Sequence, residues 1–233
     1  MLDSIRLRFK EGADRVLGRG LPVEPAVVFP TATLGDSSYG AWTFCPARIA
    51  QGGVIYSFGV DEDISWEIKE YGVTIHAFDP TPRSAQFVKR QTLPGEFIFH
   101  AYGIADYDGT ASFYPPENSE WVSHTILKRR ATAKKAIEVP VRRLETIMSS
   151  LGHERVDLIK MDIEGAEYGV IGDIVKSSPV AGGAEQLLVE FHHRFPGKGI
   201  ADTKECIAAL ERVQFKSFHI SPSTVDWGFV RCR

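Results

Sequence analysis

Hydrophobic residues along this chain alternate between short continuous runs and stretches with helical spacing. The continuous runs are typical of parallel strands that are buried on both faces. They occupy residues 53–58, 73–78, 96–105, 155–162 and 185–191. Helical spacing or helix start signals occur between them. These predicted helices occupy residues 63–72, 81–91, 143–152, 166–177 and 203–212. The alternation predicts an α/β fold with a mostly parallel sheet and helices on both of its faces.

Three shorter features modify this regular pattern. Residues 215–220 and 226–232 predict two strands whose connection is too short for a helical crossover, which indicates an antiparallel hairpin. The pair Asp108-Gly109 within residues 106–114 is a second hairpin turn signal. Residues 137–142 predict a further strand. The sheet is therefore expected to end with an antiparallel strand.

The first 50 residues follow a different pattern from the rest. Residues 1–20 predict one helix, and residues 21–50 are punctuated by prolines and glycines, with a short strand near 41–44. We predict an N-terminal helix and cap segment at 1–50 and one domain at 51–233. Residues 115–136 interrupt the alternation of predicted strands and helices. Their basic stretch at 124–135 is interpreted either as a surface that attracts an anionic acceptor molecule or as a solvated loop.

Composition and charge narrow the class of protein. The net charge is -3 and the isoelectric point is about 6.2, which argues against a dedicated nucleic-acid-binding protein. No run approaches the ~18 apolar residues of a transmembrane helix. Three cysteines stand far apart without a Cys-x-x-Cys pair, so we expect reduced thiols and a cytoplasmic location.

Candidate chemistry gathers where predicted strands end, because open α/β sheets bind ligands outside the carboxyl ends of their strands. Gly59 follows the first strand, and Asp79 follows the second strand about 20 residues later. An acid at this spacing commonly accepts hydrogen bonds from the hydroxyl groups of a ribose. The usual Gly-x-Gly-x-x-Gly is absent, and Asp61 and Asp63 stand in this turn. These acids would repel a dinucleotide diphosphate but tolerate the cationic cofactor S-adenosylmethionine.

Two further clusters carry candidate catalytic groups. Asp162 and Glu164 follow the fourth strand, where carboxylates could hold an ammonium group or accept a proton from a hydroxyl. His192 and His193 follow the fifth strand, and successive side chains of a strand point in opposite directions, so at most one should face the site. Asp162, Glu190 and one histidine could form a metal site, although the favoured interpretation contains no metal.

At these residues the sequence resembles the FkbM family of S-adenosylmethionine-dependent methyltransferases. The segment Asp157–Glu167, which reads DLIKMDIEGAE, is similar to the family signature after the fourth strand. Supporting matches are Val54–Asp63, His76–Pro82, the Asp-Gly pair and Val189–His193. The residues of His76–Pro82 and Val189–His193 resemble the branch of this family that includes methyltransferase-like proteins.

The resemblance implies a Rossmann-like class I methyltransferase with a seven-stranded sheet whose last strand is antiparallel. It implies that Gly59, Val60 and Asp61 approach the methionine part of the cofactor and that Asp79 holds the ribose. Ile104 would flank the adenine and Asp162 would lie near the reacting methyl group. The family is associated mainly with O-methylation of sugars or secondary metabolites.

The resulting hypothesis is methyl transfer to a hydroxyl group of a small-molecule acceptor, with the proton taken by Asp162, Glu164, His192 or His193. The alternatives are a nicotinamide-dependent dehydrogenase, which the missing glycines disfavour, and a cofactor-binding module without catalysis. The sequence does not identify the acceptor molecule. It is also compatible with a homo-oligomer.

Overall fold

The computed structural model describes residues 20–35, 40–66, 72–115, 125–126, 132–177, 183–195 and 197–232. The helix predicted over residues 1–20 lies almost entirely outside these ranges. The same holds for much of the basic stretch at 124–135, of which the short 3₁₀ helix η2 (Ala133–Lys135) is described.

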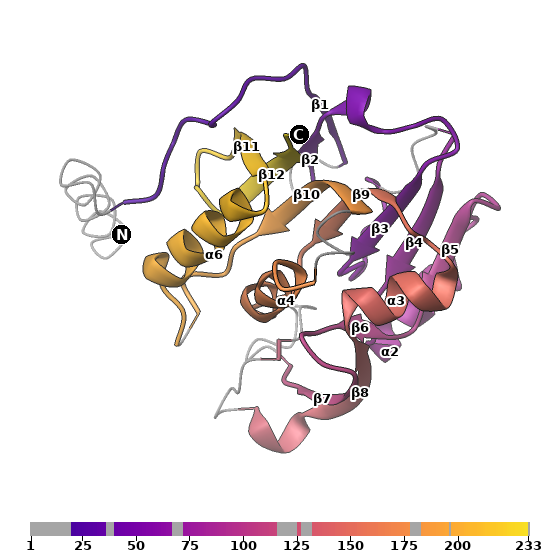
Figure 1. Ribbon diagram of the computed structural model, residues 1–233. Coiled ribbons are helices and arrows are strands. Elements are labelled where there is room, and N and C mark those ends of the chain that lie inside the picture. Colours follow the sequence, from indigo (N-terminus) through magenta and orange to yellow (C-terminus); the bar gives the residue numbers. More distant parts are fainter. Residues whose placement is uncertain are drawn as a thin grey trace.

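A seven-stranded sheet forms the centre of the molecule, in the order β11-β12-β10-β9-β3-β4-β5 (Figure 1). Its members are β3 (Val54–Phe58), β4 (Thr74–Phe78), β5 (Phe97–His100), β9 (Val156–Met161), β10 (Ala184–Glu190), β11 (Phe215–Ile220) and β12 (Asp226–Arg231). Only β12 runs against its neighbours, between β10 and β11. The predicted fold class, with an antiparallel last strand, is confirmed.

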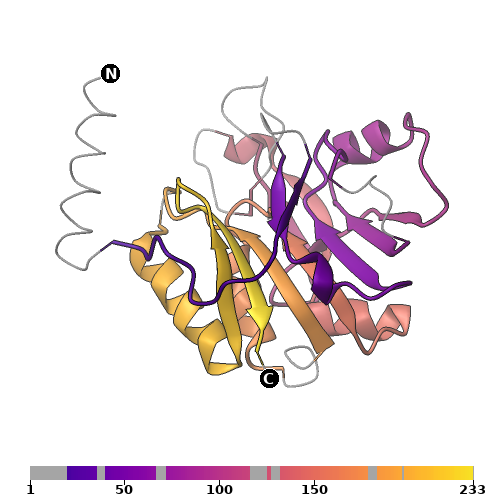
Figure 2. The ribbon, with the colours of Figure 1, turned by 90° about the horizontal axis from the view of Figure 1, so that it is seen from above.

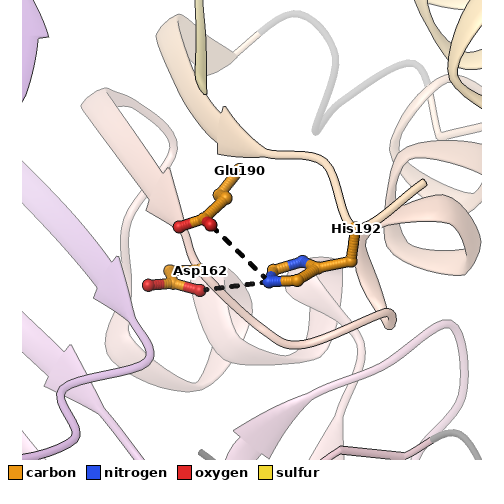
Figure 3. A group of neighbouring side chains, drawn as sticks. All are labelled: Asp162, Glu190 and His192. Carbon is orange, nitrogen blue, oxygen red and sulfur yellow. Dashed lines mark ion pairs between the residues drawn. The ribbon is translucent and has the colours of Figure 1, made fainter. Parts of the chain in front are cut away.

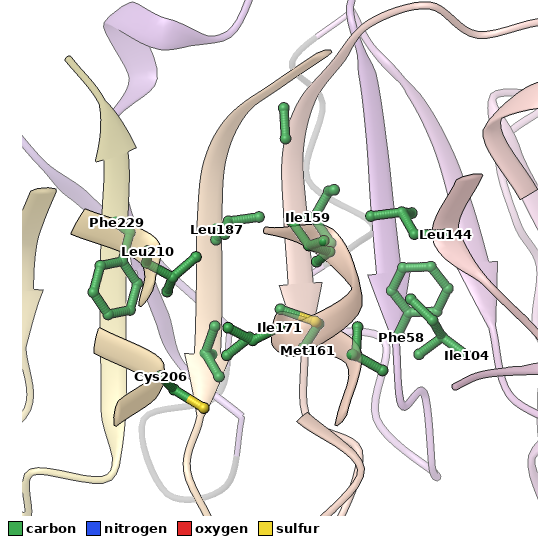
Figure 4. Packing of buried hydrophobic residues seen from close by; sticks show 14 of the residues in the cluster. Phe58, Ile104, Leu144, Ile159, Met161, Ile171, Leu187, Cys206, Leu210 and Phe229 are labelled. Atoms are coloured by element: carbon green, nitrogen blue, oxygen red, sulfur yellow. The ribbon is translucent and has the colours of Figure 1, made fainter. Parts of the chain in front are cut away.

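Successive side chains along each strand point to opposite faces of the sheet, and both faces are buried. In β3, Tyr56 and Phe58 point to one core and Ile55 to the other. On the first face the sheet packs against α3 (Leu144–Leu151), α4 (Glu167–Ile174) and α6 (Ile200–Arg212), which supply Leu144, Ile171 and Leu210 (Figure 4). Both faces of these strands are therefore removed from water, as their continuous apolar runs indicated.

The second face is covered by α2 (Pro82–Val88) and by a hairpin of β1 (Ala32–Leu34) and β2 (Trp42–Phe44) (Figure 2). Trp42 and Phe44 are buried there, and the 3₁₀ helix η1 (Pro46–Arg48) follows them. The helix α2 begins as expected, because Thr81 accepts a hydrogen bond from the Ser84 amide and Pro82 occupies the first turn. No helix in the described ranges combines the length and the apolar character needed to cross a bilayer.

Two predictions from the sequence are wrong in the segment around residue 100. The single strand expected over 96–105 is divided: β5 ends at His100, and β6 (Gly103–Ile104) belongs to a separate three-stranded sheet. The hairpin expected at Asp108-Gly109 is also absent from this sheet, because β8 (Ile137–Arg142) lies between β6 and β7 (Gly109–Phe113).

The side chain of Asp108 explains the second error. Its carboxylate accepts hydrogen bonds from the Arg143 amide at 2.9 Å and from the Thr146 hydroxyl at 2.8 Å. Asp108 thus contacts the start of α3 instead of turning the chain between two paired strands. Of the helix predicted at 63–72, the described residues 63–66 are not helical, and residues 67–71 lie outside the described ranges.

Candidate functional site

The parallel strands bring the predicted site residues to one edge of the sheet. Gly59 follows β3, Asp79 follows β4, and Asp162 follows β9. Glu190 is the last residue of β10. Because β4, β3, β9 and β10 are neighbours and run in the same direction, four segments that are distant in sequence meet there.

A hollow of about 570 Å³ opens at this edge, and the residues at its two ends differ in character. Phe78, Pro80, Ile104 and Phe113 line one end with apolar surface. The other end is polar and is lined by Gly59, Asp61, Asp162 and Glu164. This first hollow offers an apolar surface for a flat ring beside acceptors for charged groups. Of the predicted cofactor residues, all but Val60 line it.

Gly59 makes the close approach of β3 and β9 possible. Its φ angle is +84°, and a Cβ atom at this position would lie 1.8 Å from the carbonyl oxygen of Asp162. Its amide donates to the carbonyl of Phe78, and the Asp162 amide donates to the carbonyl of Phe58. Only glycine fits this backbone conformation and this contact, so the position is set by the geometry of the turn.

Asp79 is buried and organises the turn after β3. Its Oδ2 atom accepts hydrogen bonds from the amides of Val60 and Asp61, both at 3.1 Å. Its Oδ1 atom accepts from the amide and the hydroxyl of Thr81, at 2.8 and 2.7 Å. A carboxylate has about four acceptor positions. All four are occupied, so a ribose hydroxyl would have to replace one of these donors. The predicted ribose contact stays a prediction.

A second hollow of about 660 Å³ adjoins the first, and its lining is strongly acidic. Five carboxylates and one ammonium group line it: Asp61, Asp63, Asp162, Glu164, Glu190 and Lys160. The Lys160 ammonium donates to the carbonyl of Gly59 at 2.8 Å and lies 5.3 Å from the centre of the Trp42 ring. Asp162 and Glu164 line both hollows, so two ligands could meet beside them.

His192 lies at the centre of the acidic residues. Its Nδ1 atom is 3.3 Å from Glu167, whose fully buried carboxylate also accepts from the His192 amide at 2.8 Å. Its Nε2 atom lies 3.8 Å from a carboxylate oxygen of each of Asp162, Glu164 and Glu190 (Figure 3 draws Asp162 and Glu190). The structure therefore brings the predicted groups Asp162, Glu164 and His192 together.

The pKa values of this cluster reflect burial and mutual charge. Burial alone lowers the pKa of His192, but the hydrogen bond with Glu167 and the charges of Glu167, Asp162 and Glu164 outweigh it and raise the pKa to about 10. Burial and the neighbouring Asp162 charge raise the pKa of Glu190 to about 8. Both shifts favour the protonated forms of His192 and Glu190.

His193 does not join this cluster. It is buried, and it lines neither hollow. Both histidines lie beyond the end of β10, so the loop and not strand alternation sets their directions. Glu190 was predicted only as a possible metal ligand, and the contact of Glu167 with His192 was not predicted. A signal for Glu190 was its place at the end of a buried strand, two residues before His192. Lys160, a charged residue inside an apolar strand, carried a similar signal.

Two residues of this site also have strained backbone conformations. Asp61 and Glu164 both have a φ angle of +50°, a conformation that few non-glycine residues adopt. Each follows the end of a parallel strand and lines both hollows. Strained residues cluster at functional sites, where the surrounding contacts hold them, so their position here agrees with a binding role.

Comparison with known protein families decides the class of this domain. Residues 40–217 match the model of the methyltransferase FkbM domain. The chain belongs to the FkbM methyltransferase family. The match confirms the family that the sequence motifs indicated, and it includes the strands and loops that form both hollows of this FkbM domain.

Two curated relatives have similar sequences. Probable methyltransferase-like protein 24 of Rattus norvegicus is 26% identical over 176 residues, and that of Homo sapiens is 24% identical over 176 residues. Each alignment covers 71% of this chain and 42% of the relative, so this FkbM chain spans less than half the length of the curated relatives it matches.

Solved structures of two fibrillarins align with this FkbM chain. The pre-rRNA processing fibrillarin of Methanococcus jannaschii is 12% identical, with a TM-score of 0.48, covering 90% of this chain and 86% of the fibrillarin. The fibrillarin of Aeropyrum pernix, solved with natively bound S-adenosylmethionine, is 11% identical, with a TM-score of 0.40, covering 78% of this chain and 66% of the fibrillarin.

Proposed function

We propose that this FkbM domain transfers a methyl group from S-adenosylmethionine to a hydroxyl oxygen of a small-molecule acceptor, such as a sugar or a secondary metabolite. The observation that carries the proposal is the acidic lining shared by the two adjoining hollows. The cofactor has a sulfonium and an ammonium group, and carboxylates at the strand ends would stabilise both charges. Membership of a methyltransferase family supports the same conclusion.

The proposed pose places the cofactor in the first hollow. The adenine would pack against the apolar end, near Ile104 and Phe113, and the methionine part would approach Gly59 and Asp61. The methyl group would then face Asp162, beside the second hollow. An acceptor in the second hollow would bring its oxygen in line with the methyl carbon and the sulfur, and this alignment is the main contribution of the protein to the rate.

The chemical step requires a group that takes the proton of the hydroxyl. The oxygen forms a bond to the methyl carbon, the carbon–sulfur electron pair moves to sulfur, and neutral S-adenosylhomocysteine leaves. Asp162 and Glu164 line both hollows and are the best-placed acceptors for the proton. His192 adjoins them, whereas His193 is the weakest of the four candidates because it lines neither hollow.

A dehydrogenase that uses a nicotinamide dinucleotide fits the site less well. Its diphosphate would face Asp61, Asp162 and Glu164 at the polar end of the first hollow, and like charges would repel it. A module that binds the cofactor without catalysis stays as the second alternative, and measured turnover would exclude it. Unpaired cysteines support a reducing compartment such as the cytoplasm.

The experiment that tests the proposal is transfer of radiolabelled methyl groups to a panel of hydroxyl acceptors. We expect Asp162→Ala to lower turnover at least tenfold, because it removes the carboxylate shared by the two hollows. Glu62→Gln should leave turnover unchanged, because Glu62 is exposed, is paired with Arg83 and lines neither hollow. Equal turnover in both variants would contradict the proposed role of Asp162.

A further inference from the structure

We propose that Asp162, Glu190 and His192 form a binding site for a divalent metal cation beside the cofactor, and that this cation holds the acceptor oxygen. The metal site itself depends only on these three side chains. Its role in the reaction rests on the proposed methyl transfer. A cation at this position would explain how an acidic hollow can hold a deprotonated acceptor.

The three side chains have the spacing of metal ligands. One ligand atom from each lies within 4.8 Å of the others, and the His192 Nε2 atom is 3.8 Å from Asp162 Oδ1 and from Glu190 Oε1 (Figure 3). Metal bonds of about 2.0–2.2 Å allow two ligand atoms to lie up to about 4.2 Å apart. Closure around an ion therefore needs only a small movement of the two carboxylates.

His192 supplies independent support, because its ring is almost fully buried and still has no hydrogen bond at Nε2 within the described part of the chain. The side chain is 9% exposed, and Nε2 points toward three carboxylates that are all at the same distance of 3.8 Å. Direct ion pairs between these groups would normally close to about 2.7–2.9 Å. The observed distances are instead compatible with ligand atoms arranged around a shared cation.

Glu167 orients the ring as the outer partner of a metal-binding histidine does. It is fully buried, it accepts hydrogen bonds from the amides of Gly165 and His192, and its Oε1 atom lies 3.3 Å from Nδ1 of the ring. A hydrogen bond at Nδ1 leaves the Nε2 lone pair directed at the metal position. The carboxylate–histidine pair and the two acidic ligands together form a metal site with an orienting outer partner.

Rigid elements hold the ligands. Asp162 directly follows β9, Glu190 ends β10, and these strands pair in parallel up to Met161 and Val189. Two carboxylates and one imidazole suit a cation that accepts both oxygen and nitrogen ligands, such as Mn²⁺. Glu164, also 3.8 Å from Nε2, could add a ligand directly or through water.

The location gives the cation a defined chemical task. Asp162 lines both hollows and Glu190 lines the second, so the ion would lie beside the acceptor oxygen and leave the path from that oxygen to the methyl carbon open. A cation bound to the acceptor hydroxyl lowers the pKa of that hydroxyl and orients the oxygen. The proton leaves to the Glu164 carboxylate or to water, and the oxygen then forms its bond to the methyl carbon as described above.

The direct test is titration of the whole chain with Mn²⁺ alone, followed by electron paramagnetic resonance of free Mn²⁺. We expect one Mn²⁺ per chain in the unmodified protein and at least tenfold weaker binding in Glu190→Gln. The control variant Glu62→Gln removes an exposed carboxylate that lines neither hollow, and it should bind as the unmodified protein does. If Glu190→Gln does not fold, His192→Gln replaces it with the same expected loss.

Absence of binding below about 1 mM, or equal binding by Glu190→Gln and Glu62→Gln, would overturn the metal site. Methyl transfer assays with and without a chelator separate this inference from the proposed function. Mn²⁺ binding without any transfer would contradict the proposed function and leave the metal site standing. Full transfer in the chelator by a protein that binds no Mn²⁺ would contradict the metal site alone.

Discussion

Replacing Gly59 with alanine is expected to lower the free energy of unfolding by about 2–5 kcal/mol and to weaken S-adenosylmethionine binding at least a hundredfold. The new Cβ atom would lie 1.8 Å from the carbonyl oxygen of Asp162, and the backbone has a φ angle of +84°. Overpacking typically costs about 1–3 kcal/mol and left-handed backbone about 1–2 kcal/mol more. Relief would require the ends of β3 and β9 to separate, which would move Asp162 away from the cofactor.

Gly52→Ala is the matched control for this prediction. Gly52 also has a positive φ angle, +71°, but a Cβ atom there would meet nothing within 4 Å. It should therefore show only the cost of the left-handed backbone, about 1–2 kcal/mol, and bind the cofactor normally. Urea unfolding and calorimetric titration of both variants provide the comparison. Equal losses in the two variants would show that the contact with Asp162 is not the constraint.

Asp79→Asn is expected to lower the free energy of unfolding by about 3–6 kcal/mol and to weaken cofactor binding more than tenfold. The asparagine side chain offers one acceptor oxygen, so its amino group must face two of the four donors that Asp79 now satisfies. Each lost hydrogen bond to a buried charged group costs about 1.5–3 kcal/mol. The turn at Val60 and Asp61 would lose its anchor.

Glu62→Gln tests whether this loss is specific to the buried carboxylate. Glu62 lies in the same turn, but its ion pair with Arg83 is exposed, and such pairs contribute about 0–1 kcal/mol. Denaturant unfolding of both variants measures the difference. The same data distinguish two roles of Asp79. Weaker cofactor binding by Asp79→Asn with unchanged stability would indicate a direct ribose contact in place of the structural role.

The sequence was sufficient for the sheet because burial dominates these strands. Residues 155–162 could be recognised as a strand without knowledge of their neighbours, since Val156, Leu158, Ile159 and Met161 place apolar side chains on both faces. The run at 96–105 looked equally continuous, but β5 and β6 belong to different sheets. The break between them depends on pairing with β8, which lies more than 30 residues away, and no local pattern encodes that pairing.

In the candidate site, too, some residues could be identified from the sequence and others could not. Gly59, Asp79 and Asp162 could be identified because each directly follows a strand, and the carboxyl ends of parallel strands meet. Glu190 could be proposed as a metal ligand from its place at the end of a strand, but the contact of Glu167 with His192 could not be predicted, because it depends on how α4 and β10 pack together. Asp79 illustrates a further limit: its type and spacing fit a ribose contact, whereas its four hydrogen bonds are visible only in three dimensions.

Calorimetric titration of the unmodified chain with S-adenosylmethionine and, separately, with NAD⁺ tests the central claim most directly. The acidic edge should bind the adenosyl sulfonium compound with one site per chain and show no binding of the dinucleotide at the same concentrations. Tight binding of NAD⁺ without binding of S-adenosylmethionine would contradict the account of this site.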